Sequence, residues 1–158
     1  MKKMQKTLVA LLCLVCVLST VFVLFACTDK NANDLEKTVT IVIGEGETAT
    51  AETVKTTGKY LVDLLIELTN REENKLVLAG EWSQYGLYIT EIGNLKQDTA
   101  QSQYVYLFIS DTEYQNISAT AMKREYNDTE LAESLCGVSS LPLKDGCVYM
   151  FTLVTFSF

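Results

Sequence analysis

The sequence predicts an α+β fold, most like a β-grasp, in which a mixed sheet of four or five strands packs on one helix. Two observations predict this fold. Runs rich in β-branched and aromatic residues, which favour strands, recur from residues 38–43 to residues 147–154. One stretch after the second such run has leucines at helical spacing, and an amphipathic helix that follows a hairpin must cover one face of a sheet.

The predicted domain begins with a hairpin. Residues 38–43 (TVTIVI) form the first strand, Gly44-Glu-Gly46 forms a turn, and residues 48–56 alternate loosely as the second strand. Thr57 is the predicted N-cap of the helix that follows, which fades near Thr69-Asn70.

The apolar stripe of this helix is expected to cover the sheet. Its members are Leu61, Leu64, Leu65 and Leu68, spaced i, i+3, i+4 and i+7. We expect Tyr106 or Phe108 among the neighbours of the stripe, because both lie on the run 104–109 (YVYLFI), the most β-prone in the chain and the predicted central strand.

The rest of the domain is read as strands separated by turns. Besides the central strand, the predicted strands are residues 76–78, 86–92 and 147–154. Residues 120–126 fit a strand, whereas residues 129–135 fit either a helical turn or an irregular strand. Asp145-Gly146 marks the turn before the last strand.

The N-terminal 26 residues have the parts of a bacterial signal peptide. Three lysines precede an uncharged apolar run that closes on Leu24-Phe-Ala-Cys27, which resembles a lipobox. The resemblance implies that the Cys27 thiol receives a lipid, that the chain is cut before Cys27, and that the protein is a lipoprotein on the extracytoplasmic face of the cell membrane. The alternative is an uncleaved helix over residues 8–26, about 28 Å long, which would also leave the domain outside.

We therefore expect three regions: a signal peptide (1–26), the lipidated cysteine with a flexible polar tether (27–37), and the folded domain (38–158). The signal peptide holds three of the 13 basic residues and none of the 20 acidic ones, so residues 27–158 carry a net charge of −10. Such a surface repels nucleic acid, which we exclude as a partner.

The chemistry of the chain favours binding over catalysis. It contains no histidine, which removes the commonest general base and metal ligand. Oxygen-rich stretches at residues 111–113 and 127–130 lack the spacing of a calcium loop and are read as solvated loops. We expect no catalytic residue, no metal and no cofactor. Cys136 and Cys147 could form a disulfide, or could both be small apolar core residues.

Three segments carry a resemblance to a known family. They are Thr57–Leu65 in the helix, Tyr85–Asn94 (YGLYITEIGN), and Gly137-Val138 with residues 141–149 (LPLKDGCVY). In order and spacing these segments resemble the bacterial domain family related to the C-terminal domain of transcobalamin, over about residues 38–158. The resemblance implies a ubiquitin-like β-grasp fold. In transcobalamin this domain closes over cobalamin held on a separate helical barrel, so corrinoid capture is an alternative function.

The predicted function is that of a membrane-anchored module that binds a small molecule or docks onto a surface protein. The candidate ligand-binding residues are the aromatic side chains around the 82–88 junction and on the next strand: Trp82, Tyr85, Tyr88 and Tyr104. Clustered aromatics suit a planar ligand or a sugar, although Tyr and Trp at alternating strand positions are also common half-buried sheet residues.

Overall fold

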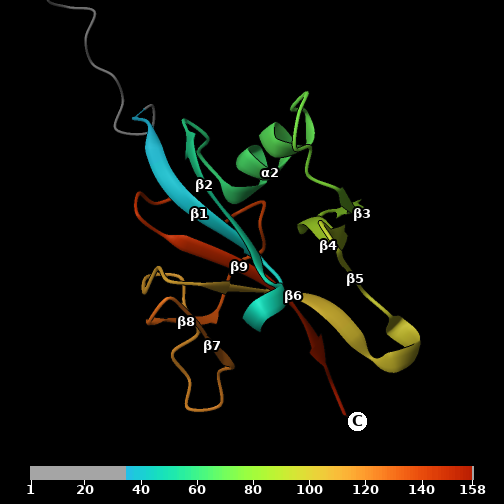
Figure 1. Ribbon diagram of the computed structural model, residues 1–158. Helices are drawn as coiled ribbons and strands as arrows, with labels where there is room; N and C mark the ends of the chain where they lie inside the picture. Colours follow the sequence, from blue (N-terminus) through green and yellow to red (C-terminus); the bar gives the residue numbers. More distant parts are fainter. Residues whose placement is uncertain (1–34, 158) are drawn as a thin grey trace, which may run out of the picture. The chain divides into compact units, whose positions relative to one another are not determined.

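Two sheets and an α-helix make up residues 35–157, the part of the chain that the computed structural model describes (Figure 1). The predicted signal peptide, Cys27 and most of the tether lie outside these residues. The larger sheet contains β1 (Lys37–Ile43), β2 (Thr50–Thr56), β6 (Gln103–Ile109), β7 (Lys123–Tyr126), β8 (Thr129–Glu133) and β9 (Val148–Thr155). The smaller sheet contains β3 (Leu78–Ser83), β4 (Gly86–Ile92) and β5 (Leu95–Lys96).

The larger sheet is mixed, as predicted. Its strand order is β2-β1-β9-β6-β8-β7, and the smaller sheet has the order β3-β4-β5. β1 and β2 form the expected antiparallel hairpin, with Val39 opposite Val54. β1 runs parallel to β9, the last strand, and β9 runs antiparallel to β6, so the first and last strands of the domain lie side by side at its centre.

The helix α2 (Leu61–Thr69) buries the predicted leucine stripe. Its N-terminus differs from the prediction, because Tyr60 and not Thr57 is the N-cap. The Asp63 carboxylate accepts hydrogen bonds from the backbone N–H groups of Lys59 (3.0 Å) and Tyr60 (2.8 Å). Asp63 therefore holds the two residues that precede the helix, whereas the free N–H groups of Leu61 and Val62 donate to the carbonyls of Leu141 (2.9 Å) and Val138 (3.0 Å).

The helix and the smaller sheet share a core with one face of the larger sheet. This core includes Val39 and Ile41 from β1, the α2 leucines, Ile89 and Ile92 from β4, and Phe151 from β9. Figure 1 shows α2 and the smaller sheet on the same side of β1, β9 and β6.

A second core lies on the opposite face of the larger sheet. It contains Phe108, with Tyr106 packed against it, whereas Val105, Leu107 and Ile109 face the helix side. The expectation that Tyr106 or Phe108 would neighbour the leucine stripe is therefore wrong, because alternate residues of a strand project to opposite faces.

The strand count and some boundaries also differ from the sequence prediction. The described residues contain nine strands in two sheets instead of four or five in one. The sequence left open whether residues 129–135 form a helical turn or a strand, and residues 129–133 form the strand β8. A strand was expected at residues 76–78, but β3 begins only at Leu78. Short 3-10 helices, η2 (Gly46–Thr48) and η3 (Thr99–Gln101), lie between β1 and β2 and between β5 and β6.

A β-bulge allows the smaller sheet to bury two isoleucines of β4. Gly80 pairs with Ile89 and Ala79 with Glu91, so Thr90 is an extra residue in β4. The extra residue reverses the alternation of side chains, and Ile89 and Ile92, three positions apart, both reach the core.

Candidate functional site

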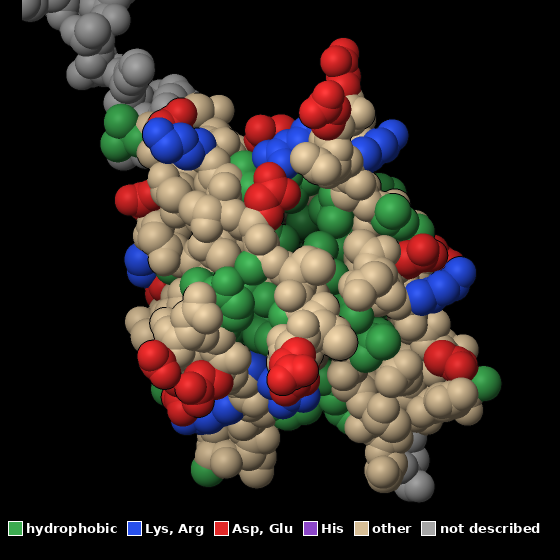
Figure 2. Space-filling model, in the orientation of Figure 1, with side chains coloured by type: hydrophobic (Ala, Val, Ile, Leu, Met, Phe, Trp, Pro, Cys, Tyr) green, Lys and Arg blue, Asp and Glu red, His purple; other side chains and the backbone are tan. Residues whose placement is uncertain are grey.

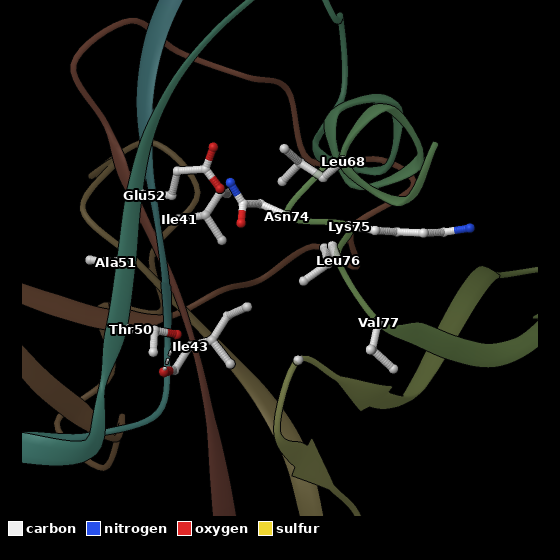
Figure 3. Close-up of a pocket in the computed structure, with 11 residues that line it drawn as sticks. Ile41, Ile43, Thr50, Ala51, Glu52, Leu68, Asn74, Lys75, Leu76 and Val77 are labelled. Carbon is white, nitrogen blue, oxygen red and sulfur yellow. Dashed lines mark hydrogen bonds between the residues drawn. The ribbon is translucent and has the colours of Figure 1, made fainter. Parts of the chain in front are cut away.

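A groove of about 420 Å³ opens between the β1–β2 hairpin and residues 74–77, which connect α2 to β3 (Figure 3). In the space-filling view, hydrophobic side chains line a hollow next to the hairpin and charged side chains surround its mouth (Figure 2). The volume lies within the range of small-molecule sites, roughly 300–1,000 Å³. This groove is the candidate functional site.

The floor of the groove is apolar. It is lined by Ile41, Ile43, Leu68 and Leu76. The turn between β4 and β5 closes one end at Gly93, which has a φ of +58°. A Cβ atom there would lie 3.0 Å from Ile43 Cγ2. Glycine therefore permits both the left-handed backbone conformation and the close approach of this turn to Ile43 on the floor.

The rim of the groove is polar. Glu52 on β2 forms an ion pair with Arg71, which follows α2. Asn74, with a φ of +51°, and Glu52 point toward each other in Figure 3, whereas Lys75 points away from the groove. An apolar floor beneath polar side chains suits a ligand with an apolar body and a polar end.

The groove residues were not among the sequence-predicted site residues. The sequence predicts the isoleucines of β1, and Leu76 and Val77, only as strand residues, and it predicts no element for residues 70–75. One sequence feature does indicate the rim of the groove. The run Asn70–Lys75 is entirely polar and joins the end of a buried helix to an apolar segment, which is typical of an exposed loop that carries binding residues.

The predicted aromatic residues do not form one platform. Trp82 and Tyr88 lie on β3 and β4; their side chains are 64 % and 49 % exposed. Trp82 pairs with Leu87 and Tyr88 with Glu81 in adjacent register positions, so the two rings project from opposite faces of the smaller sheet. Tyr85 lies in the connecting turn and is 85 % exposed.

Tyr104 is separated from the other three aromatic residues. Its ring packs 6.0 Å from that of Phe156, which belongs to the core on the opposite face of the larger sheet. Tyr88 also has a polar partner, because its hydroxyl donates to Gln97 Oε1 at 2.8 Å. None of the four residues lines the groove; their role in binding stays a prediction.

A second cavity, of about 260 Å³, lies between β4, β6 and residues 134–138. Cys136 is one of its lining residues. Cys147, at the start of the last predicted strand, is buried, and the two thiols are free. Burial raises the pKa of Cys147, and a hydrogen bond with Ser110 opposes that shift in part, so this thiol is held in its protonated form.

The acidic stretch at residues 111–113 contributes to an ion pair. Lys144 Nζ donates to Asp111 Oδ1 at 2.7 Å. In residues 35–157 no three His, Cys, Asp or Glu side chains lie close enough to hold a metal ion together. No helix within that same range is long and apolar enough to cross a membrane.

No family model and no curated protein matches this sequence, but solved structures share its fold. A protein of Ruminococcus gnavus ATCC 29149, described as a candidate metal-binding protein, is 21 % identical with a TM-score of 0.52; the match covers 77 % of this chain and 100 % of that chain. Haptocorrin, solved in complex with Cbi, is 12 % identical with a TM-score of 0.55; the match covers 78 % of this chain and 26 % of that chain.

These likenesses concern the fold alone. The chain spans about a quarter of haptocorrin, and the likeness fits a transcobalamin-like fold. The structure of residues 35–157 is thus an α+β domain with one mixed sheet, one smaller antiparallel sheet and one α-helix, similar in fold to part of haptocorrin.

Proposed function

We propose that residues 38–158 are a binding domain that holds a small amphipathic molecule in the groove between the β1–β2 hairpin and residues 74–77. The observation that carries the proposal is the combination of an apolar floor, made by β1 and α2, with the Glu52–Arg71 pair at the mouth. Because most of the floor and the hairpin wall belong to β1, β2 and α2, these parts of the groove are formed before a ligand arrives, which lowers the entropic cost of binding.

We also propose that the fold is a β-grasp. The support is the order of its first elements, a hairpin and then a helix across the sheet, together with the parallel pairing of the first and last strands. In this fold β3, β4 and β5 form a second sheet, which is inserted in the sequence between the helix α2 and the central strand β6.

The cellular setting of the domain belongs to the same proposal. The lipobox-like residues 24–27 support a lipid anchor at Cys27 on the extracytoplasmic face of the membrane. A durable anchor needs more than one acyl chain, which lipidation of a cysteine by a diacylglyceryl group provides. In this setting we propose binding, of a small molecule or a surface protein, and not catalysis.

The alternative function is corrinoid capture. It is supported by the family resemblance and by the likeness to haptocorrin, whose solved structure holds Cbi. That likeness is at 12 % identity, so no binding residue transfers to this chain. A titration with cyanocobalamin and with cobinamide, followed by their visible absorbance, tests this alternative directly. An unchanged spectrum at saturating protein would exclude corrinoid capture.

The groove is tested by filling it. Thr50 and Ala51 are neighbours on β2 and both border the groove. Thr50 is the partner of the floor residue Ile43, whereas Ala51 pairs with Val42 of the opposite core, and its side chain points away from the groove in Figure 3. Thr50→Phe should therefore obstruct the groove, and Ala51→Phe is the matched control. The probe is 1-anilinonaphthalene-8-sulfonate, whose fluorescence rises in apolar sites.

We expect saturable dye binding that Thr50→Phe weakens by about tenfold, since loss of one well-packed apolar contact is worth about 1–3 kcal/mol. Ala51→Phe should bind as wild type does. Metabolites that displace the dye then identify the ligand class. Equal dye affinity in all three proteins would show that the groove is not the site. Trp82→Ala should leave the affinity unchanged; a loss there would favour the aromatic residues of β3 and β4 instead.

A further inference from the structure

The strand β6 is paired along its whole length on one side only. β9 pairs with every residue from Gln103 to Ile109. On the other side β8 pairs only with Phe108 and Ile109, and Figure 1 shows β8 beside one end of β6. The rest of this side of β6 is a sheet edge inside the strand order of the larger sheet.

The hydrogen-bond register identifies the backbone groups at this edge. Ser110 N–H donates to the Val148 carbonyl (3.1 Å) and Phe156 N–H to the Ser102 carbonyl (3.0 Å), so the even-numbered residues of β6 bond to β9. The odd-numbered residues direct N–H and C=O away from β9, because antiparallel pairing alternates in this way.

Two of these odd-numbered residues have partners at the ends of the edge. Gln103 exchanges two hydrogen bonds with Asp98, both of 2.9 Å, and the Leu107 carbonyl accepts from Ser134 N–H at 3.0 Å. Between them, the register leaves the N–H and C=O of Val105 and the N–H of Leu107 facing the open side. These three groups present a donor, an acceptor and a donor in strand spacing.

The edge is open because the chain turns away after β8. The Ser134 hydroxyl donates to the Cys136 carbonyl (2.8 Å) and accepts from Cys136 N–H (3.2 Å), which forms a tight turn. Leu135 N–H donates to the Tyr114 carbonyl at 2.8 Å and not to β6. The Leu135 side chain is left 64 % exposed at the edge.

The 260 Å³ cavity adjoins this edge. Val105 and Leu107 line it together with apolar side chains of β4, β9 and the 134–138 segment: Leu87, Ile89, Val138 and Phe151. A residue that paired with Val105 would place its side chain on this face of the sheet. The cavity therefore offers room for one aliphatic side chain beside an unpaired strand edge.

The opposite face of the edge is aromatic and acidic. Tyr106 lies there, and its pKa is raised by burial and by the charge of Glu133. Residues 27–158 carry a net charge of −10, which disfavours a second copy of this chain as the occupant and favours a basic one.

We propose that the open edge of β6 at Val105 and Leu107 is a docking site for an extended peptide segment of another protein, in which one aliphatic residue is flanked by lysines. The segment adds a short strand to the sheet between Asp98 and Ser134, with its aliphatic side chain in the cavity and a lysine beside Tyr106 and Glu133. This inference gives a site to the protein-docking half of the proposed function, and it does not depend on the groove.

The first test uses a synthetic peptide as probe. The acetylated and amidated pentapeptide Thr-Lys-Val-Lys-Thr is titrated into the 15N-labelled domain, residues 28–158, and the backbone amide signals are followed. We expect the amide signals of Val105 and Leu107 to shift saturably. The same peptide with an N-methyl group on its central valine loses one hydrogen bond and should bind about tenfold more weakly. Equal binding of the two peptides, or shifts confined to the groove residues, would overturn the proposal.

The second test changes the protein. Val105→Pro removes an N–H that β9 does not use, and an edge position tolerates proline. Val105→Thr keeps the N–H and the branched shape and is the matched control. We expect the proline variant to lose about tenfold in peptide affinity, with the threonine variant close to wild type. Analytical ultracentrifugation tests whether a second copy of the chain occupies the edge instead. The peptide proposal would be overturned if the protein self-associates, the proline variant does not, and the peptide fails to dissociate the oligomer.

Discussion

Lys144 and Asp111 join the two central strands β6 and β9 at one end of the larger sheet. Asp111 follows β6, and Lys144 lies in the turn before β9; the Lys144 ammonium donates to Asp111 Oδ1 at 2.7 Å. The Asp111 side chain is only 1 % exposed, whereas that of Lys144 is 53 % exposed. The second carboxylate oxygen of Asp111 has no hydrogen-bond partner, so this ion pair and the N–H of Glu113 are what compensate its burial.

Removal of this carboxylate should destabilise the domain. Asp111→Ala loses a hydrogen bond to a charged group and one to a backbone N–H, and we expect the free energy of unfolding to fall by about 1.5–3 kcal/mol. Urea denaturation followed by circular dichroism measures the change. Glu113→Ala, at an exposed neighbouring position, is the control and should stay within about 0.5 kcal/mol of wild type.

Stability should fall at alkaline pH because of Tyr149. Its hydroxyl accepts from the Lys144 N–H (2.9 Å) and donates to the Pro142 carbonyl (3.2 Å), and burial holds its pKa well above the usual 10.0. Above pH 10 the unfolded chain releases this proton and the folded chain retains it, so the stabilisation present below pH 10 decreases by about 1.4 kcal/mol per pH unit.

The variant Tyr149→Phe isolates this effect. It should be less stable than wild type at pH 7, because the Lys144 N–H loses its acceptor, but its stability should decrease less steeply between pH 10 and 11. The raised pKa values of Cys147 and Lys144 act in the same direction and remain in both proteins. Identical slopes for wild type and Tyr149→Phe would show that the phenol titrates normally in the folded state.

The leucine stripe of α2 should dominate the packing of the helix. Leu65 is fully buried, and Leu65→Ala should reduce the free energy of unfolding by about 2–5 kcal/mol. Ile66, the next residue, is 42 % exposed, so Ile66→Ala should cost far less and serves as the control. Equal losses in the two variants would place the helix in a different rotation about its axis.

The two cysteines of the domain should be present as free thiols. A protein of residues 28–158 contains no cysteine other than Cys136 and Cys147, and titration of the denatured protein should give two thiols per chain. In the folded protein Cys147 should react much more slowly than Cys136, because it is buried and its raised pKa reduces the thiolate population. A count of zero would mean that a disulfide forms.

The lipid anchor is tested at Cys27. Cys27→Ser removes the thiol that the lipobox reading requires, so the variant should not incorporate labelled palmitate and should keep its leader. It should run at a higher apparent mass than the processed protein. Incorporation at the wild-type level would rule out lipidation at this cysteine and favour the uncleaved helix over residues 8–26.

Local patterns predicted the elements well where one face of an element is buried. The leucine spacing identified α2, and the β-branched and aromatic runs identified β1, β4, β6 and β9 within one or two residues. The N-cap was missed because a threonine before the helix is the usual signal, whereas here the Asp63 side chain reaches back to two N–H groups.

Sheet membership and the site could not be predicted in the same way. Alternation along residues 104–109 shows that Tyr106 and Leu107 face opposite sides, but nothing local indicates which side receives the helix. The sequence places the aromatic residues 82, 85, 88 and 104 close together only if their strands belong to one sheet, whereas they lie in two. The groove depends on Ile43 and Leu76, which long-range packing brings together.

The pairing of β1 with β9 has a consequence for how the protein is made. Thr40 lies beside Val148 in the sheet, although more than one hundred residues separate them, and closing such a long loop is entropically costly and slow. During synthesis the N-terminal segment is made first, and β1 stays unpaired on that side until the last strand has been made. The hairpin partner β2 protects only its other edge. The incomplete chain is therefore most exposed to aggregation and proteolysis before β9 is available, and truncations that remove β9 should yield no folded domain.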